Sequence, residues 1–106
     1  MDSLTIKELR DVAEKSLPAG STLWLYGSRA RGDAHADSDW DLLVLVNKSA
    51  IETDDFENIC YPLVLLGWQH GADVNPQLYT KSEWDKRRFT PYFDNVEHDK
   101  KVIYES

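Results

Sequence analysis

Several features that would define a class of protein are scarce or absent in this sequence of 106 residues. Its single cysteine, Cys60, excludes a disulfide framework and any zinc or redox site built on paired cysteines. Because Cys60 falls among apolar residues at helical spacing, we expect a buried thiol there. The longest apolar stretch, residues 61–68, is far too short to cross a membrane. Met1 is followed by a charged amphipathic segment and not by an apolar leader. These absences predict a cytoplasmic protein with no membrane anchor.

Positive charge is also scarce. The chain has 12 lysines and arginines against 19 aspartates and glutamates, a net charge of −7 at pH 7. Nucleic acids bind proteins mainly through their phosphates, so free DNA or RNA is a poor partner for this chain. Local positive charge is confined to Arg29 with Arg31 and to residues 86–88. A hydrophobic content of 42% suffices for a packed core, and the length predicts a single domain spanning residues 1–106.

The apolar pattern predicts helices that alternate with strands. Thr5 and Glu8 have the spacing of a capping box, and apolar residues recur at helical spacing after them. We expect strands at 22–26, 39–46 and 74–79, and helices at 6–17, at 28–31, from residue 54 onward and at 82–88. Pro62 predicts a kink in the helix that begins at residue 54. This order predicts an α+β layered fold, and the final stretch, residues 90–106, stays unassigned.

Two of the expected strands can be placed in the sheet. Strand 39–46 is apolar on both faces, which predicts a central strand covered on both sides. Pro76 cannot donate a hydrogen bond to a neighbouring strand, so strand 74–79 is expected at an edge or with a bulge. The connection between strands 22–26 and 39–46 is compatible with either a parallel or an antiparallel pair.

Two aspartates stand where strand 39–46 begins. Side chains alternate across a strand, so Asp39 and Asp41 share a face, with Cα atoms about 7 Å apart. Carboxylates this close repel each other unless a cation lies between them or solvent screens them. Their oxygen atoms suit Mg²⁺, which keeps water and substrate phosphates as further ligands. An isolated Asp-x-Asp is more often a solvated strand end, and the pair alone does not exclude that interpretation.

A glycine turn precedes the two aspartates. Gly27 allows a phosphate to approach the backbone closely, and Ser28, at the start of a short helix, offers hydrogen bonds. Arg29 and Arg31 add positive charge, although a short helix must turn one of them away. A Gly-Ser turn is a weak signal by itself. Joined to Asp-x-Asp at a fixed gap, it predicts a metal-dependent site for phosphate chemistry.

Gly27-Ser28, ten residues and then Asp39-Trp40-Asp41 form the pattern Gly-Ser-x10-Asp-x-Asp. This pattern resembles that of the DNA polymerase β-like nucleotidyltransferase superfamily, and in particular of its small stand-alone minimal nucleotidyltransferases. The resemblance is strongest over residues 23–46. It implies the nucleotidyltransferase fold, a small mixed β-sheet flanked by helices. It also implies that Gly27, Ser28 and Arg29 hold the triphosphate of ATP or another nucleotide, and that Asp39 and Asp41 ligate two Mg²⁺ ions.

Members of this superfamily usually supply a third carboxylate from a neighbouring strand. Asp73, directly before strand 74–79, is the candidate here, as a third metal ligand and as a catalytic ligand or base toward the acceptor. The alternative interpretation is an ordinary turn over residues 71–73. Asn75, on the same face as Asp73, would then be a weaker ligand. Activity is therefore conditional on this third position.

The resemblance implies an enzyme that moves a nucleoside monophosphate, AMP from ATP, to a hydroxyl acceptor. The chain is too short to hold a separate acceptor-binding domain. The resemblance therefore implies a separately encoded helical partner of the HEPN class, with this chain as the antitoxin that adenylylates a tyrosine of its partner. Two alternatives stay open: an inactive protein that neutralises its partner by occlusion, and transfer to a small hydroxylated molecule. A homo-oligomer is also compatible with the sequence.

Overall fold

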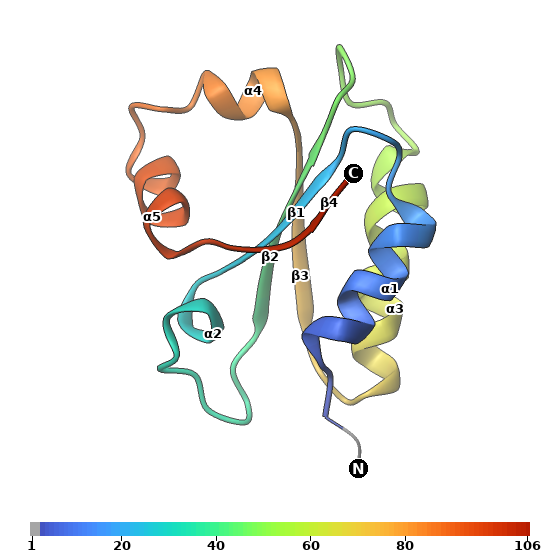
Figure 1. Ribbon diagram of the computed structural model, residues 1–106, viewed down its shortest axis with the longest axis vertical. Helices are drawn as coiled ribbons and strands as arrows, with labels where there is room; N and C mark the ends of the chain where they lie inside the picture. Colours follow the sequence, from blue (N-terminus) through green and yellow to red (C-terminus); the bar gives the residue numbers. More distant parts are fainter. Residues whose placement is uncertain (1–2) are drawn as a thin grey trace.

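The computed structural model describes residues 3–106 as a four-stranded sheet with helices on both faces (Figure 1). In chain order the elements are α1 (Ile6–Ser16), β1 (Thr22–Tyr26), α2 (Ser28–Arg31), β2 (Trp40–Val46), the π-helical turn η1 (Phe56–Cys60), α3 (Tyr61–Gln69), β3 (Val74–Thr80), α4 (Lys81–Asp85), α5 (Pro91–Asp99) and β4 (Lys101–Glu105). The strand order is β3-β2-β1-β4. β1 pairs antiparallel with β2 and with β4, whereas β2 and β3 are parallel. The predicted α+β fold with a mixed sheet is confirmed.

Helix α1 begins at the predicted capping box. The Glu8 N–H donates to the Thr5 hydroxyl at 3.2 Å, and the Thr5 N–H donates to the Glu8 carboxylate at 3.0 Å. These two bonds satisfy N–H groups that the first turn of a helix cannot pair internally. On the side of α1 that faces the sheet, Leu9 and Ala13 are fully buried. The cap and the apolar face together fix where α1 begins and which side it buries.

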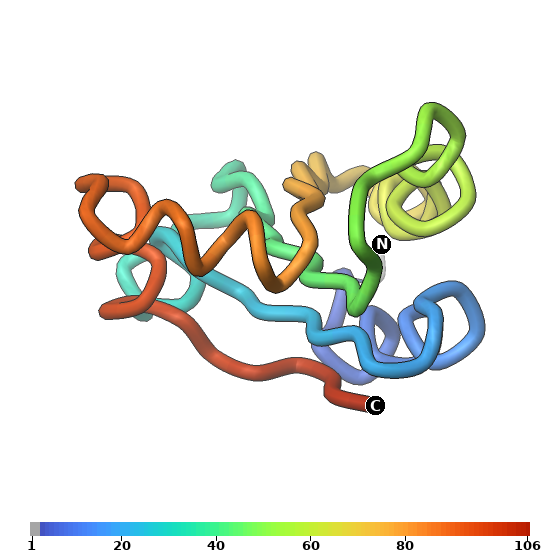
Figure 2. Tube along the Cα trace, turned by 90° about the horizontal axis from the view of Figure 1, so that it is seen from above, coloured from blue at the N-terminus to red at the C-terminus, as the bar shows by residue number. Residues whose placement is uncertain are grey.

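The side chains of β2 alternate between two cores. Leu42 and Val44 point into a core beneath α1 and α3, and Leu43 and Leu45 point into a second core beneath α4 and α5. Figures 1 and 2 show α1 and α3 together on one side of the sheet and α5 on the other. β2 is therefore the central strand that its two apolar faces predict.

The two edges of the sheet differ in how well the sequence predicts them. β3 is an edge strand, as Pro76 predicts. The other edge is β4, which with α5 is formed by the stretch that the sequence left unassigned. Thr90 caps α5, because its hydroxyl accepts the Phe93 N–H at 3.2 Å. Only Ile103 of β4 is buried, so β4 carries little of the alternating apolar signal of a strand.

The helix after β2 runs through Pro62. A proline has no N–H to donate within a helix, and its ring crowds the preceding turn. Directly before Pro62 the chain forms the wider turn η1, in which the Tyr61 N–H donates to the Phe56 carbonyl. α3 then continues to Gln69, so the irregularity predicted at Pro62 takes the form of a π-turn. Across residues 3–106, no helix has the length and apolar character needed to span a bilayer.

Candidate functional site

The turn between β1 and α2 forms one wall of the site. Gly27 has φ 77° and ψ −158°, a backbone conformation that is essentially restricted to glycine. A Cβ added to Gly27 would lie 2.5 Å from Oδ2 of Asp41. Only glycine therefore lets this turn approach the carboxylate so closely. Ser28 follows at the start of α2 and is partly exposed beside the turn.

The two aspartates lie where β2 begins. Asp41 is half-buried and pairs across the ladder with Tyr26 of β1, and Asp39 is exposed one residue before the strand. Their alternation with Leu43 places both on the side of the sheet that α4 and α5 cover. Burial and the charge of Asp39 raise the pKa of Asp41, and Arg31 opposes that rise. Negative charge is thus concentrated here and only partly compensated.

The start of β3 lies beside these aspartates. The parallel register pairs Asn75 with Asp41. Asp73 is exposed one residue before β3, and its carbonyl accepts the Trp40 N–H at 2.9 Å, which sets it level with the entrance of β2. Among the side chains of residues 3–106, no group of three His, Cys, Asp or Glu is arranged to hold a metal ion. Because Asn75 is the β3 residue paired with Asp41, the side chain beside Asp41 is an amide and not a carboxylate.

The two arginines of α2 face different sides of β2. The guanidinium of Arg29 lies 4.4 Å from the centroid of the Trp40 ring and donates to the Ser38 carbonyl at 2.8 and 3.0 Å. Trp40 belongs to the core beneath α1 and α3, on the face of β2 away from Asp41. Arg29 thus holds the loop that leads into β2, on the face of β2 away from Asp41.

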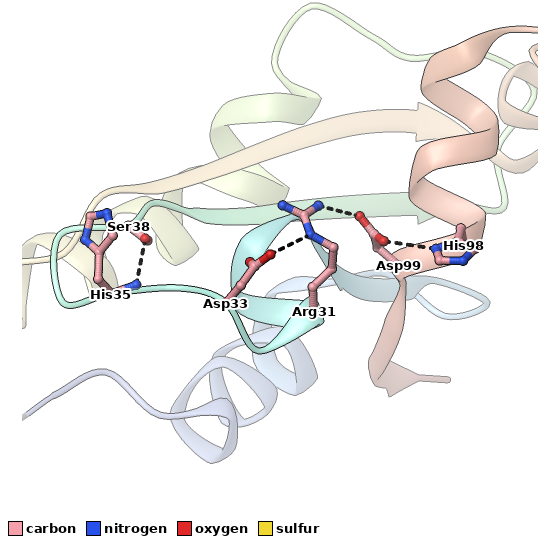
Figure 3. A network of polar contacts seen from close by, with 6 residues as sticks. All are labelled: Arg31, Asp33, His35, Ser38, His98 and Asp99. Atoms are coloured by element: carbon pink, nitrogen blue, oxygen red, sulfur yellow. Dashed lines mark hydrogen bonds and ion pairs between the residues drawn. The ribbon is translucent and has the colours of Figure 1, made fainter.

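Arg31 is the arginine on the side of Asp41, and its charge acts on that carboxylate. Its Nη1 donates to Asp99 Oδ2 at 2.7 Å and its Nε donates to Asp33 Oδ2 at 3.2 Å (Figure 3). The hydrogen bond from Arg31 lowers the pKa of Asp99, so Asp99 is a carboxylate at neutral pH. The sequence pattern shows that one arginine must turn away, but it cannot connect Arg31 with Asp99, which is 68 residues distant.

Helix α5 lies over this side of the sheet and is held near both of its ends. The hydroxyl of Tyr92 is 3.0 Å from that of Tyr26, and the two rings meet edge to face. At the other end, Asp99 binds Arg31. Burial raises the pKa of both tyrosines, so both hydroxyls stay neutral at physiological pH. α5 thereby forms a second wall of the site, which the unassigned end of the sequence gave no means to predict.

Comparison with known proteins identifies the family. A model of the family described as nucleotidyltransferase domain matches residues 6–103. The chain belongs to this family. Membership of this family supports transferase activity, and the predicted family is confirmed. No curated protein matches the sequence.

Solved structures show the same fold. The nucleotidyltransferase domain is 17% identical to a chain in the crystal structure of a toxin-antitoxin with AMP-PNP, with a TM-score of 0.65, covering 97% of this chain and 75% of that chain. A chain in the structure of a mutant of the toxin-antitoxin MntA-HpeT is 17% identical, with a TM-score of 0.68. That match covers 98% of this chain and 75% of the other. A chain in the structure of a tri-AMPylated Shewanella oneidensis HEPN toxin in complex with MNT antitoxin is 14% identical, with a TM-score of 0.58. That match covers 95% of this chain and 70% of the other. At these identities the likeness concerns the fold.

The donor set of the nucleotidyltransferase domain fits Mg²⁺. Asp39 and Asp41 offer hard oxygen atoms on one face of β2. Burial and, after it, the charge of Asp39 raise the pKa of Asp41, and a divalent cation would offset both effects. Because Gly27 has no Cβ, the Asp41 carboxylate lies directly beside the glycine turn, so a metal at the carboxylates and a phosphate at the turn would be neighbours. The residues present therefore fit the metal that the family implies, with two carboxylates in place and an amide at the adjoining position of β3.

Proposed function

We propose that this nucleotidyltransferase domain transfers AMP from ATP to a hydroxyl group of a partner protein. The observation that carries the proposal is the 2.5 Å separation between Asp41 Oδ2 and a Cβ added at Gly27. It supports the interpretation that the glycine turn and the carboxylate pair belong to one site. Gly27 and Ser28 would bind the triphosphate, and Asp39 and Asp41 would hold two Mg²⁺ ions. We further propose that residues 1–106 form a single cytoplasmic domain.

The transfer is a displacement at phosphorus. The acceptor oxygen forms a bond to the α-phosphorus, the bond from that phosphorus to the oxygen bridging to the β-phosphorus breaks, and pyrophosphate leaves. Bound Mg²⁺ would lower the pKa of the attacking hydroxyl and offset the charge of the leaving pyrophosphate. Arg31, on the side of Asp41, would exchange its contact with Asp99 for one with the phosphates. The exposed Asp73, level with the entrance of β2, is our candidate for the third ligand or for the base that accepts the hydroxyl proton.

The comparisons support the nucleotide and the kind of acceptor. One similar structure is a toxin-antitoxin with AMP-PNP, and another pairs an MNT antitoxin with a tri-AMPylated HEPN toxin. We therefore propose ATP as the donor and a helical HEPN-class protein as the partner. The net charge of −7 also suits a protein acceptor better than a nucleic acid.

A label-transfer experiment tests this function. The chain is incubated with Mg²⁺, ATP labelled at the α-phosphate and the product of the neighbouring gene, and the same is done with a variant carrying Asp39→Ala and Asp41→Ala. We expect label on the partner with the wild type and none with the variant, provided that circular dichroism shows both to be folded. Absence of label with the wild type, while the partner is still neutralised equally by both proteins, contradicts the proposal.

One observation favours a second function, neutralisation of a partner by occlusion without transfer. The ladder position next to Asp41 is held by Asn75, and within residues 3–106 no third carboxylate joins the pair. An amide oxygen is a neutral and weaker ligand for Mg²⁺ than a carboxylate. The label-transfer experiment separates the two functions, because occlusion predicts equal neutralisation by the wild type and the double variant.

A further inference from the structure

The outer surface of α3 carries an apolar stripe. Tyr61, Leu65 and Trp68 are spaced four and three residues apart, which places them on one side of a helix. Their side chains are 39%, 39% and 58% exposed. The rings of Tyr61 and Trp68 meet edge to face, with centroids 6.2 Å apart. Large apolar side chains are thus grouped where the described chain leaves them open to solvent.

The π-turn η1 extends this stripe by one aromatic ring. In a regular α-helix, residues five positions apart point about 140° away from each other. In η1 the Tyr61 N–H donates to the Phe56 carbonyl, so Phe56 lies about one turn below Tyr61 on nearly the same side. Phe56 is 44% exposed. We call the side chains of Phe56, Tyr61, Leu65 and Trp68 the α3 stripe.

The α3 stripe has two features of a self-complementary surface. The nine residues of α3 include no charged side chain, so two copies placed face to face bring no like charges together there. Beside the stripe is an open groove of about 300 Å³ between α1 and α3. Its lining is Val12, Pro62 and Leu66, Leu65 from the stripe itself, and the polar side chains of Lys15, Ser16 and Gln69. A ridge next to a groove on one face allows a two-fold axis to place each ridge in the other copy's groove.

The position of the α3 stripe distinguishes a second copy from the acceptor protein. α3 lies on one side of the sheet, whereas Asp41 shares the other side with α4 and α5 (Figures 1 and 2). A protein on the α3 stripe would therefore lie across the sheet from the carboxylates, where the acceptor hydroxyl has to arrive. This choice of occupant rests on the proposed function.

We propose that the α3 stripe is the centre of a two-fold homodimer interface, which leaves both carboxylate sites facing outward. The exposed parts of its four side chains amount to about 400 Å² of apolar surface. A stable interface buries about 800 Å² on each partner, with somewhat more than half of it apolar. The α3 stripe thus supplies most of the apolar area that one partner of an ordinary dimer buries.

Sedimentation equilibrium of the chain alone tests the dimer. The wild type should have a mass of about 24 kDa, twice the 12.2 kDa of one chain. Trp68→Glu should sediment as a monomer, because a central aromatic side chain typically changes a dissociation constant by about 30-fold or more. Phe89→Glu is the matched control, since Phe89 is 92% exposed on the α4–α5 connection, on the other side of the sheet (Figure 1). This control should remain a dimer.

Salt gives a second readout. Each copy carries a net charge of −7, so added salt should strengthen the dimer by screening repulsion between the copies. A wild type that stays monomeric at the highest concentration, a Trp68→Glu dimer, or equal dissociation by Phe89→Glu overturns the proposal. A wild-type monomer that loses binding to the partner protein on Trp68→Glu, measured in a separate binding assay, also overturns it and assigns the α3 stripe to that partner. The sedimentation experiment uses neither nucleotide nor acceptor, so its failure is distinct from failure of label transfer.

Discussion

Replacing Gly27 by alanine perturbs the turn and the carboxylate together. The new Cβ would lie 2.5 Å from Asp41 Oδ2, a contact shorter than Cβ atoms in real proteins make. Because that oxygen is the end of a side chain, Asp41 can rotate away, and the collision becomes a displacement of the carboxylate. The backbone itself has φ 77° and ψ −158°, a conformation that alanine adopts only at a cost.

The magnitude follows from these two effects. The backbone strain should lower the free energy of unfolding by roughly 1–3 kcal/mol. A displacement of a reacting group by about 1 Å can reduce a rate by about 100-fold, so we expect a loss of AMP transfer of that order. Gly32→Ala is the matched control, since Gly32 has φ 85° and no heavy atom lies within 4 Å of its added Cβ. It should cost about 1 kcal/mol and leave transfer nearly unchanged.

Urea unfolding followed by tryptophan fluorescence measures the free energy of unfolding of Gly27→Ala and Gly32→Ala. Label transfer from ATP measures the rate of AMP transfer by each variant. Under conditions where both variants are folded to a similar fraction, Gly27→Ala should lose AMP transfer and Gly32→Ala should keep it. If both variants lose transfer equally, or if Gly27→Ala retains it, the closeness of the turn to Asp41 is not what the site depends on.

Three further predictions concern other residues. Arg31→Ala should weaken ATP binding about tenfold in calorimetric titrations, because it removes a charge-assisted donor beside Asp41, whereas Arg29→Ala should lower thermal stability with a smaller effect on affinity. Asn75→Asp should lower the melting temperature in EDTA by adding repulsion beside Asp41, and Mg²⁺ should restore it; equal melting temperatures in both buffers would contradict this. Burial raises the pKa of Cys60 to about 12, so its thiol should react with a chromogenic disulfide only after unfolding.

Local signals in the sequence predicted much of the fold. Thr5 and Glu8 form the predicted capping box, and Pro76 lies in an edge strand. The alternating side chains of β2 enter two cores, as a strand with two apolar faces predicts. These features depend on residues a few positions apart, where spacing alone determines the geometry. The antiparallel pairing of β1 with β2 was left open, because the connecting loop fits either direction.

The site was less accessible to sequence reasoning where its geometry depends on distant segments. The direction of Arg29 and Arg31 is decided by what each one meets, Trp40 in one case and Asp99 in the other. The register of β3 against β2 places Asn75 beside Asp41, and a shift of one residue would have brought a different side chain there. Such relations follow from tertiary pairing and are not contained in the spacing of a motif.

Calorimetric titration of a non-hydrolysable ATP analogue, with and without Mg²⁺, tests most directly whether the turn and the two aspartates form one nucleotide site. The comparison is between the wild type and a variant with Asp39→Asn and Asp41→Asn, which keeps size and removes charge. The wild type should bind the analogue more tightly when Mg²⁺ is present, because the metal joins the carboxylates to the phosphates. The variant should show no such gain. An equal gain from Mg²⁺ in both proteins would contradict the account.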